Sequence, residues 1–300
     1  MSFILSCCST ADMPAEYYEK RDINYVCFHF ELDGKNYIDD LGKTMSMKEF
    51  YDAMRNGAMT KTSQVNAEEY EAYFESFLKE GHDLLHLCLS SGISGTANSA
   101  MIAQRELQEK YPERKIYVVD SYAASAGFGL LMDKLADMRD EGKTIDEVYA
   151  WAMDNRLKLH HWFFTSDLTF FVRGGRVSKV SGFVGNVLNI CPLLNVDFEG
   201  KLIPRYKIRT KRKAIQAIVD KMEETAIDGL DYSGKCFISN SDCMEDAQAV
   251  ADLIEERFPK LNGKVYITSI GTTIGSHTGP GTVALFYWGQ TRVDLFYGDR

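Results

Sequence analysis

The sequence lacks the short motifs that mark common catalytic and cofactor sites. It contains no HExxH, P-loop, GxGxxG or acidic metal box, so no motif predicts a metal or nucleotide site. Its seven cysteines form no CxxC pair and no Cys/His cluster at zinc spacing. Most of them lie within apolar runs, as is typical of reduced thiols. We therefore expect no metal, no cofactor and a cytoplasmic protein.

Membrane and nucleic-acid features are also scarce. No apolar run approaches the roughly 18 residues that a membrane span needs. The first eight residues lack the basic start of a signal peptide and are too short for one. The net charge of -9, from 34 basic and 43 acidic residues, disfavours a polyanionic partner. We expect no nucleic acid and no integral membrane segment.

The pattern that is present predicts an α/β protein. A length of 300 residues is typical of about two domains. In the first half, buried strands are expected at 84–89 and 116–119, followed by helices at 96–111 and 123–139. Alternation of this kind predicts parallel βαβ units. From about residue 165 the pattern is typical of an α+β domain, with a strand at 202–210 and a helix at 211–225 among its elements.

Polar residues collect in three expected loops. Residues 90–96, Ser-Ser-Gly-Ile-Ser-Gly-Thr, follow a buried strand and open a helix, where hydroxyls and amides can bind an anion or merely cap the helix. Residues 60–64, read as a polar loop, contain Thr62-Ser63-Gln64, a weak signal alone. The third loop, 271–281, surrounds His277 with glycines, which allow a ligand to approach the backbone closely. This histidine can therefore bind an anion, or it can play a structural role.

Two alternatives concern histidine and serine chemistry. His160-His161 lies beside aromatic residues, which favours packing. Around Ser94 the sequence Gly-Ile-Ser-Gly-Thr departs from the G-x-S-x-G nucleophile elbow, since its second glycine comes one residue early. A serine hydrolase is therefore disfavoured.

Basic residues cluster at two places. Arg173 and Arg176 flank two glycines. A dense run follows at Arg205, Lys207, Arg209, Lys211, Arg212 and Lys213. The run is either a solvated strand–helix face or a docking patch for an acidic or phosphate-bearing partner.

Six short motifs follow one another along the chain. They are Thr62-Ser63-Gln64, Ser90-Ser91-Gly92-Ile93-Ser94-Gly95-Thr96, Asp120-Ser121, Gly174-Gly175-Arg176-Val177-Ser178, Pro192-Leu193-Leu194 and Gly275-Ser276-His277-Thr278-Gly279-Pro280-Gly281. In their order and approximate spacing they resemble the DegV family of bacterial fatty-acid-binding proteins. The resemblance covers about residues 3 to 288.

The resemblance implies two domains. Residues 1–165 would form a three-layer α/β/α domain with a parallel sheet, and residues 166–300 a two-layer α/β domain with a mixed sheet. A long-chain fatty acid would lie between them and be phosphorylated on its carboxylate by a separate fatty acid kinase, so that the acyl phosphate feeds phospholipid synthesis. The chain itself would be a lipid-binding protein and not an enzyme.

The resemblance also implies site residues. Thr62 and Ser94 look like carboxylate donors, with the helix-opening amides of Gly95 and Thr96 beside Ser94. His277 looks like the residue at the mouth, and Arg176 and Arg209 look like kinase-facing residues near the same mouth.

We also expect some of the sequence's many aromatic rings to line a tunnel leading from Thr62 and Ser94. The alternative function is an enzyme that acts on a small acyl or keto substrate through Ser94 and His277.

Overall fold

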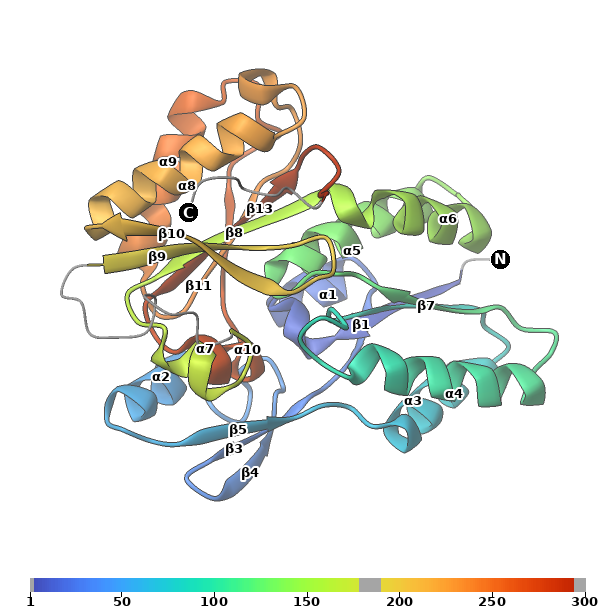
Figure 1. The fold of residues 1–300 in the computed structure, drawn as a ribbon. Coiled ribbons are helices and arrows are strands. Elements are labelled where there is room, and N and C mark those ends of the chain that lie inside the picture. Colours follow the sequence, from blue (N-terminus) through green and yellow to red (C-terminus); the bar gives the residue numbers. More distant parts are fainter. Residues whose placement is uncertain (1–2, 178–189, 294–300) are drawn as a thin grey trace.

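The computed structural model describes residues 3–177 and 190–293, so Ser178 of the Gly174–Ser178 motif lies outside the described residues. These residues form a four-stranded, a six-stranded and a three-stranded sheet (Figure 1). In the part of the chain that is described, no helix is long and apolar enough to cross a membrane.

The four-stranded sheet is entirely parallel. Its order is β2 (Asn24–Val26), β1 (Ile4–Cys8), β6 (Leu84–Cys88), β7 (Ile116–Asp120). Two pairs of packed helices contact this sheet (Figure 1). They are α3 (Ala67–Lys79) with α4 (Thr96–Lys110), and α5 (Ala126–Asp140) with α6 (Ile145–Asn155). This confirms the predicted α/β/α layers and the parallel sheet.

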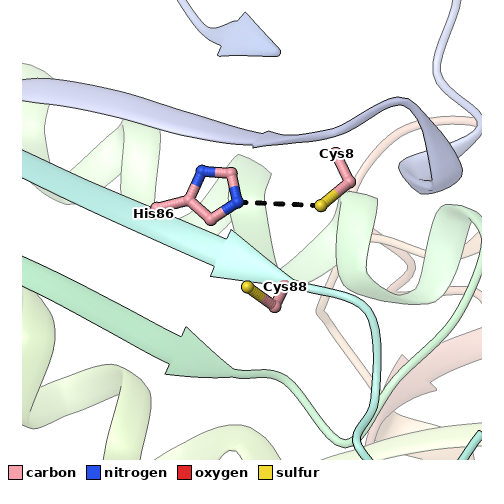
Figure 2. A group of neighbouring side chains, drawn as sticks. All are labelled: Cys8, His86 and Cys88. Carbon is pink, nitrogen blue, oxygen red and sulfur yellow. Dashed lines mark hydrogen bonds between the residues drawn. The ribbon is translucent and has the colours of Figure 1, made fainter. Parts of the chain in front are cut away.

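One face of the parallel sheet carries polar and sulfur-bearing side chains toward α3 and α4. Cys8 lies at the end of β1, and His86 and Cys88 alternate along β6 (Figure 2). The hydroxyl of Tyr70 on α3 lies 3.1 Å from Cys8 Sγ. All of these side chains are buried.

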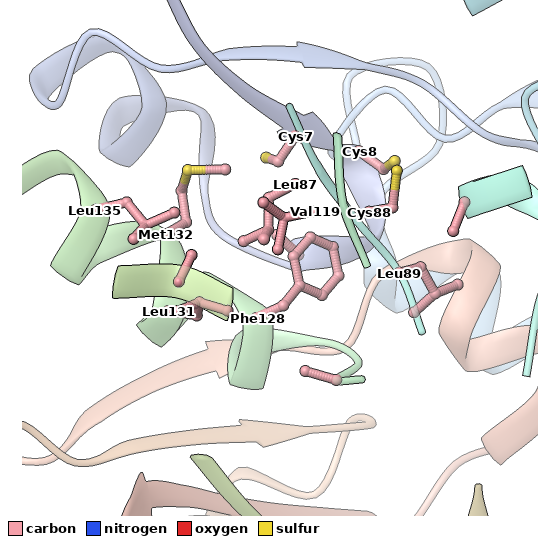
Figure 3. Close-up of a cluster of buried hydrophobic side chains, with 14 of the residues drawn as sticks. Cys7, Cys8, Leu87, Cys88, Leu89, Val119, Phe128, Leu131, Met132 and Leu135 are labelled. Carbon is pink, nitrogen blue, oxygen red and sulfur yellow. The ribbon is translucent and has the colours of Figure 1, made fainter. Parts of the chain in front are cut away.

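The other face of the parallel sheet is apolar and packs against α5. Because side chains alternate along a strand, Cys7 and Leu87 point away from Cys8 and Cys88. Phe128 and Met132 of α5 lie over Cys7 and Leu87 (Figure 3). Helix α5 therefore forms part of the core of the first domain.

The six-stranded sheet is mixed. Its order is β10 (Leu202–Arg209), β9 (Ile190–Val196), β8 (Leu159–Thr165), β13 (Thr282–Trp288), β11 (Phe237–Asn240), β12 (Tyr266–Ser269), and only β11 and β12 pair in parallel. Helices α8 (Lys211–Thr225) and α9 (Met244–Arg257) pack against it. The mixed α/β character is confirmed. Strand β8 precedes the boundary predicted near residue 165 yet pairs within this second sheet.

Helix α5 contacts the mixed sheet as well, through β8, β11 and β13. The approach is close at Gly127, where an added Cβ would lie 2.1 Å from His161 Nε2 and 2.7 Å from a ring carbon of Phe286. No side chain larger than hydrogen fits there without displacing the sheet. One helix thus holds both sheets at a set separation.

The third sheet is antiparallel and small. Its order is β4 (Lys35–Ile38), β3 (His29–Leu32), β5 (Thr60–Ser63). It packs with α2 (Met47–Arg55), which begins with a capping box formed by Ser46 and Glu49. Helix α10 (Thr272–Thr278) contacts both β3 and β5, so this sheet meets the C-terminal part of the chain.

The remaining described helices are short. They are α1 (Ala15–Lys20), α7 (Thr169–Arg173) and the 3-10 turns η1 (Ser9–Ala11), η2 (Arg156–Lys158) and η3 (Gly229–Asp231).

Three local predictions were wrong. The apolar run at residues 25–32 predicts a single strand, but it falls in two strands, β2 and β3, which belong to different sheets. The loop expected at 60–64 contains β5, whose polar side chains lack the apolar alternation typical of a strand. The loop expected at 271–281 contains α10, where Gly275 passes so close to Phe50 and Tyr51 that an added Cβ would lie 2.5 Å from the Tyr51 hydroxyl.

We predict that Gly127→Ala destabilises the protein. Overpacking a core costs about 1–3 kcal/mol, which should outweigh the gain of up to about 1 kcal/mol in helix propensity. Urea unfolding should show this as a lower midpoint. In the His161→Ala background, where the nearest clashing atom is removed, the same substitution should cost less; an equal cost in both backgrounds would contradict the packing explanation.

Candidate functional site

A cavity of about 360 Å³ lies between the two large sheets. Its wall includes Leu89 just after β6, Thr62 of β5, Phe163 of β8 and Phe286 of β13. The volume is within the range of about 300–1,000 Å³ that is typical of small-molecule sites. The chain therefore has an internal space of ligand size where its domains meet.

About half of the cavity lining is apolar. The apolar lining residues are Phe28, Leu89, Ile93, Ala124, Phe163, Phe171, Val196, Leu202, Ile270, Ile274, Ala284 and Phe286. Four of them are phenylalanines, in agreement with the expectation that aromatic rings line a space that Thr62 and Ser94 also border. A wall of this kind removes hydrocarbon from water without requiring directional contacts.

Polar lining residues gather around His277, which lies in the last turn of α10. Its Nε2 is 2.8 Å from Thr62 Oγ1, so residues 215 positions apart share one hydrogen bond. Its Nδ1 is buried without a partner among the described residues. Burial, together with the nearby positive charge of Arg176, lowers the pKa of His277 to about 4. At neutral pH the imidazole is therefore uncharged.

A glycine-containing turn brings Arg176 to the same place. Helices α7 and α10 lie in contact, and a Cβ added to Gly174 would lie 2.2 Å from His277 Nδ1 (Figure 1). Arg176 lines the cavity, donating from Nε to the carbonyl of Ile93 at 3.2 Å and from Nη1 to that of Gly174 at 2.6 Å. Burial lowers the pKa of Arg176, which nevertheless stays charged.

The loop before α4 contributes Ser94. Its Oγ lies 3.5 Å from Gln64 Oε1 and accepts from the Thr96 amide at 3.3 Å. Gly95 and Thr96 do not line the cavity. The Thr96 hydroxyl instead lies 2.7 Å from that of Tyr70. The structure thus brings Thr62, Ser94 and His277 to the cavity, while the Thr96 amide already has a partner.

Arg209 is not among the cavity-lining residues. It is exposed at the end of β10 and pairs in register with Ile190. Leu202, at the start of the same strand, does line the cavity. Arg209 comes seven positions after Leu202, which is about 23 Å along a strand. The structure therefore brings Arg176 to the cavity but not Arg209.

Sequence reasoning missed Ser125, which precedes α5 and lines the cavity. Its backbone has φ 55° and ψ −150°, a conformation that costs of order 1–3 kcal/mol for a residue other than glycine. Its Oγ lies 2.5 Å from Asp12 Oδ2 and 2.9 Å from Ser239 Oγ. Burial raises the pKa of Asp12 well above its usual value. No sequence motif predicts a contact among these three residues.

His161 both packs and lines the cavity. Its ring meets Phe286 edge to face, which agrees with the predicted packing role. Burial lowers the pKa of His161 well below its usual value, so the ring is neutral. Among the lining residues that the structure describes, Arg176 is then the one charged side chain. An apolar wall with one cation and several hydroxyl donors suits a monoanion that carries a hydrocarbon chain.

The fold and cavity define a two-domain α/β ligand-binding protein. The chain matches the model of the DegV family, described as a family of uncharacterised proteins, over residues 8–290. It is 39% identical over 290 residues to a DegV domain-containing protein of Clostridium perfringens, covering 97% of this chain and 98% of that one.

Two further similarities come from Thermotoga maritima. A protein named fatty acid-binding protein is 34% identical over 280 residues, covering 92% of this chain and 93% of its own. The crystal structure of a DegV lipid-binding protein superposes with a TM-score of 0.85 at 29% identity, covering 98% of this chain and 100% of the other. The chain therefore belongs to the DegV family, whose characterised members are fatty-acid-binding proteins.

We predict that His277 makes stability depend on pH. The unfolded histidine binds a proton below about pH 6.5 and the folded one only near pH 4, so stability should fall as pH drops through this window. His277→Gln should reduce the slope of unfolding free energy against pH by about 1 kcal/mol per pH unit around pH 5.

The measurement is urea unfolding at several pH values. His82→Gln, at a half-exposed position in the turn between α3 and β6 and outside the cavity lining, is the control. An unchanged slope in His277→Gln would show that the folded imidazole takes up its proton as readily as the unfolded one.

Proposed function

We propose that the protein binds one long-chain fatty acid in this cavity and presents its carboxylate to a separate fatty acid kinase. The observation that carries the proposal is the cavity itself, which combines an apolar wall with a cluster of donors at Thr62, Ser94 and His277. The fatty-acid-binding relative supports the same ligand class.

Burial of the hydrocarbon tail supplies most of the affinity. Each buried CH₂ contributes about 0.8 kcal/mol, so a long chain gains far more than a small polar acid can. Part of this gain offsets the lost translational, rotational and chain freedom of the ligand. The phenylalanines Phe28, Phe163, Phe171 and Phe286 provide flat apolar surface for the tail.

The carboxylate needs donors, since an unpaired buried carboxylate would take up a proton. Ser94 supplies a hydroxyl, and the hydrogen-bonded pair of Thr62 and neutral His277 supplies one further donor, either the Thr62 O–H or the His277 N–H. Arg176 adds a positive charge in the same wall. These groups hold the carboxylate ionised and leave its oxygens able to react.

The contacts disfavour the enzyme alternative. A serine nucleophile needs a base within hydrogen-bonding reach. His277 Nε2 shares a hydrogen bond with Thr62, and within the described residues Ser94 Oγ bonds to Gln64 and to the Thr96 amide. The pair that the alternative requires is therefore not formed, and binding is the favoured function.

Phosphorylation of the bound acid requires a second protein. Phosphoryl transfer needs Mg²⁺ and phosphate clamps, and the sequence contains no P-loop or acidic metal box. The exposed basic residues around Arg209 offer a docking surface on a chain of net charge -9; the exposed members are Lys207, Arg209, Lys211, Arg212 and Lys213. We propose that the kinase docks there and that the acyl phosphate then enters phospholipid synthesis.

We also propose a cytoplasmic location. The structure has seven free cysteines, five of them buried, and thiols persist unpaired in a reducing compartment.

We predict that Thr62→Ala and Ser94→Ala each weaken fatty-acid binding by about 1–3 kcal/mol, because each leaves a buried acceptor without a donor. Binding of oleate and palmitate is measured by calorimetry. Lys61→Ala in the same strand and Ser91→Ala in the same loop, both exposed, are matched controls. Unchanged affinity in both site variants would refute the carboxylate assignment.

Native mass spectrometry of mildly purified protein tests the ligand class in the same samples. The proposal requires an adduct of fatty-acid mass at one per chain. Protein that is free of adduct and indifferent to added oleate and palmitate would refute fatty-acid binding as a whole.

We predict that Arg209→Ala lowers the rate of acyl-phosphate formation with a cognate kinase by roughly three- to tenfold while leaving lipid affinity unchanged, since a peripheral charge acts mainly on association. Arg105→Ala, an exposed arginine on α4, is the control. Loss of lipid binding in Arg209→Ala would place this residue in the pocket instead.

A further inference from the structure

Three side chains with metal-binding atoms meet at the carboxyl ends of β1 and β6. Cys8 ends β1, while His86 and Cys88 stand two residues apart on β6 and so share a face (Figure 2). Cys8 Sγ, Cys88 Sγ and one ring nitrogen of His86 all lie within 4.8 Å of one another. Sequence spacing did not predict this group, because one ligand comes from a distant strand.

The distances suit a tetrahedral ion. Zinc binds thiolate at about 2.3 Å and imidazole at about 2.0–2.1 Å, which places neighbouring sulfur and nitrogen ligands about 3.6 Å apart. The distance from Cys8 Sγ to His86 Nε2 is 3.6 Å. Without an ion the same distance is a thiol–imidazole hydrogen bond, so an ion can be accommodated by small side-chain rotations alone.

A second layer of contacts orients the ligands. His86 Nδ1 lies 2.7 Å from Ser6 Oγ, and when Nδ1 donates to that hydroxyl the Nε2 lone pair faces the sulfur atoms. The Tyr70 hydroxyl lies 3.1 Å from Cys8 Sγ, where it can stabilise a thiolate or complete a fourth position. Partners of this kind accompany the ligands of natural metal sites.

Charge favours a divalent ion. Cysteine binds a metal ion as the thiolate, so the protons of both thiols would leave when a cation arrives. Two thiolates, a neutral imidazole and a divalent cation sum to zero, which a fully buried site requires.

We propose that Cys8, Cys88 and His86 bind one Zn²⁺ ion. Thiolate ligands select zinc or monovalent copper over magnesium and calcium, and copper(I) would leave a net negative charge in the core. The ion would join β1 to β6 directly below the loop that carries Ser94. Through the hydrogen bond of Tyr70 to Thr96 it would also stabilise the start of α4.

Metal analysis of the full-length reduced protein tests the proposal. Protein from zinc-supplemented cells, and protein refolded with one equivalent of ZnCl₂, should hold about one zinc per chain after gel filtration. Cobalt(II) in its place should give a thiolate-to-cobalt charge-transfer band and the visible bands of a tetrahedral site.

The variants Cys88→Ser and His86→Gln should lose zinc, with the fold checked by circular dichroism. Cys7→Ser is the matched control, because Cys7 is equally buried on the same strand but faces α5 (Figure 3). It should keep about one zinc per chain.

The proposal is overturned if intact wild-type protein holds less than about 0.1 zinc per chain by both routes. Zinc retained in Cys88→Ser and His86→Gln, or lost equally in Cys7→Ser, overturns it too. Should both ligand variants fail to fold, the wild-type cobalt spectrum decides alone, and a spectrum without a thiolate charge-transfer band refutes the site.

Discussion

Helix α5 packs against both large sheets at once, and the cavity depends on that double contact. Phe128 and Met132 cover the parallel sheet, while Gly127 lets the helix backbone approach His161 and Phe286 on the mixed sheet. Side chains in a native core are close-packed, so no free space remains at such a contact. The residues just before α5, including Ser125, are therefore held against the strands that form the opposite wall of the cavity.

The polar end of the cavity is assembled from segments that are far apart in the chain. Thr62 comes from a small edge sheet, His277 from a short helix and Arg176 from a glycine-containing turn. Gly174 permits the contact with His277, because a Cβ there would overlap the ring. Each hydroxyl or ring is partly paired already, so a ligand meets groups whose orientation is set before it binds.

Sequence periodicity predicted the elements that pack by apolar faces. The helix expected at 211–225 has the same bounds in the structure, and the strands near 84 and 116 lie where continuous apolar runs placed them. Periodicity failed at β5 and α10, which are short and polar. Their backbones are stabilised by neighbours, namely β3 for β5 and the aromatic side chains of α2 for α10.

The sequence alone determined the fold class, the family and the identity of Thr62, Ser94 and His277 as site candidates, because ordered motifs and hydrophobic patterns are local. Tertiary structure decided which of these share one cavity: it paired Thr62 with His277, placed Arg176 in the wall and left Arg209 at the far end of β10. It also joined Cys8 to His86 and Cys88. Contacts of this kind follow from strand order and helix packing, which bring together residues that are remote in sequence.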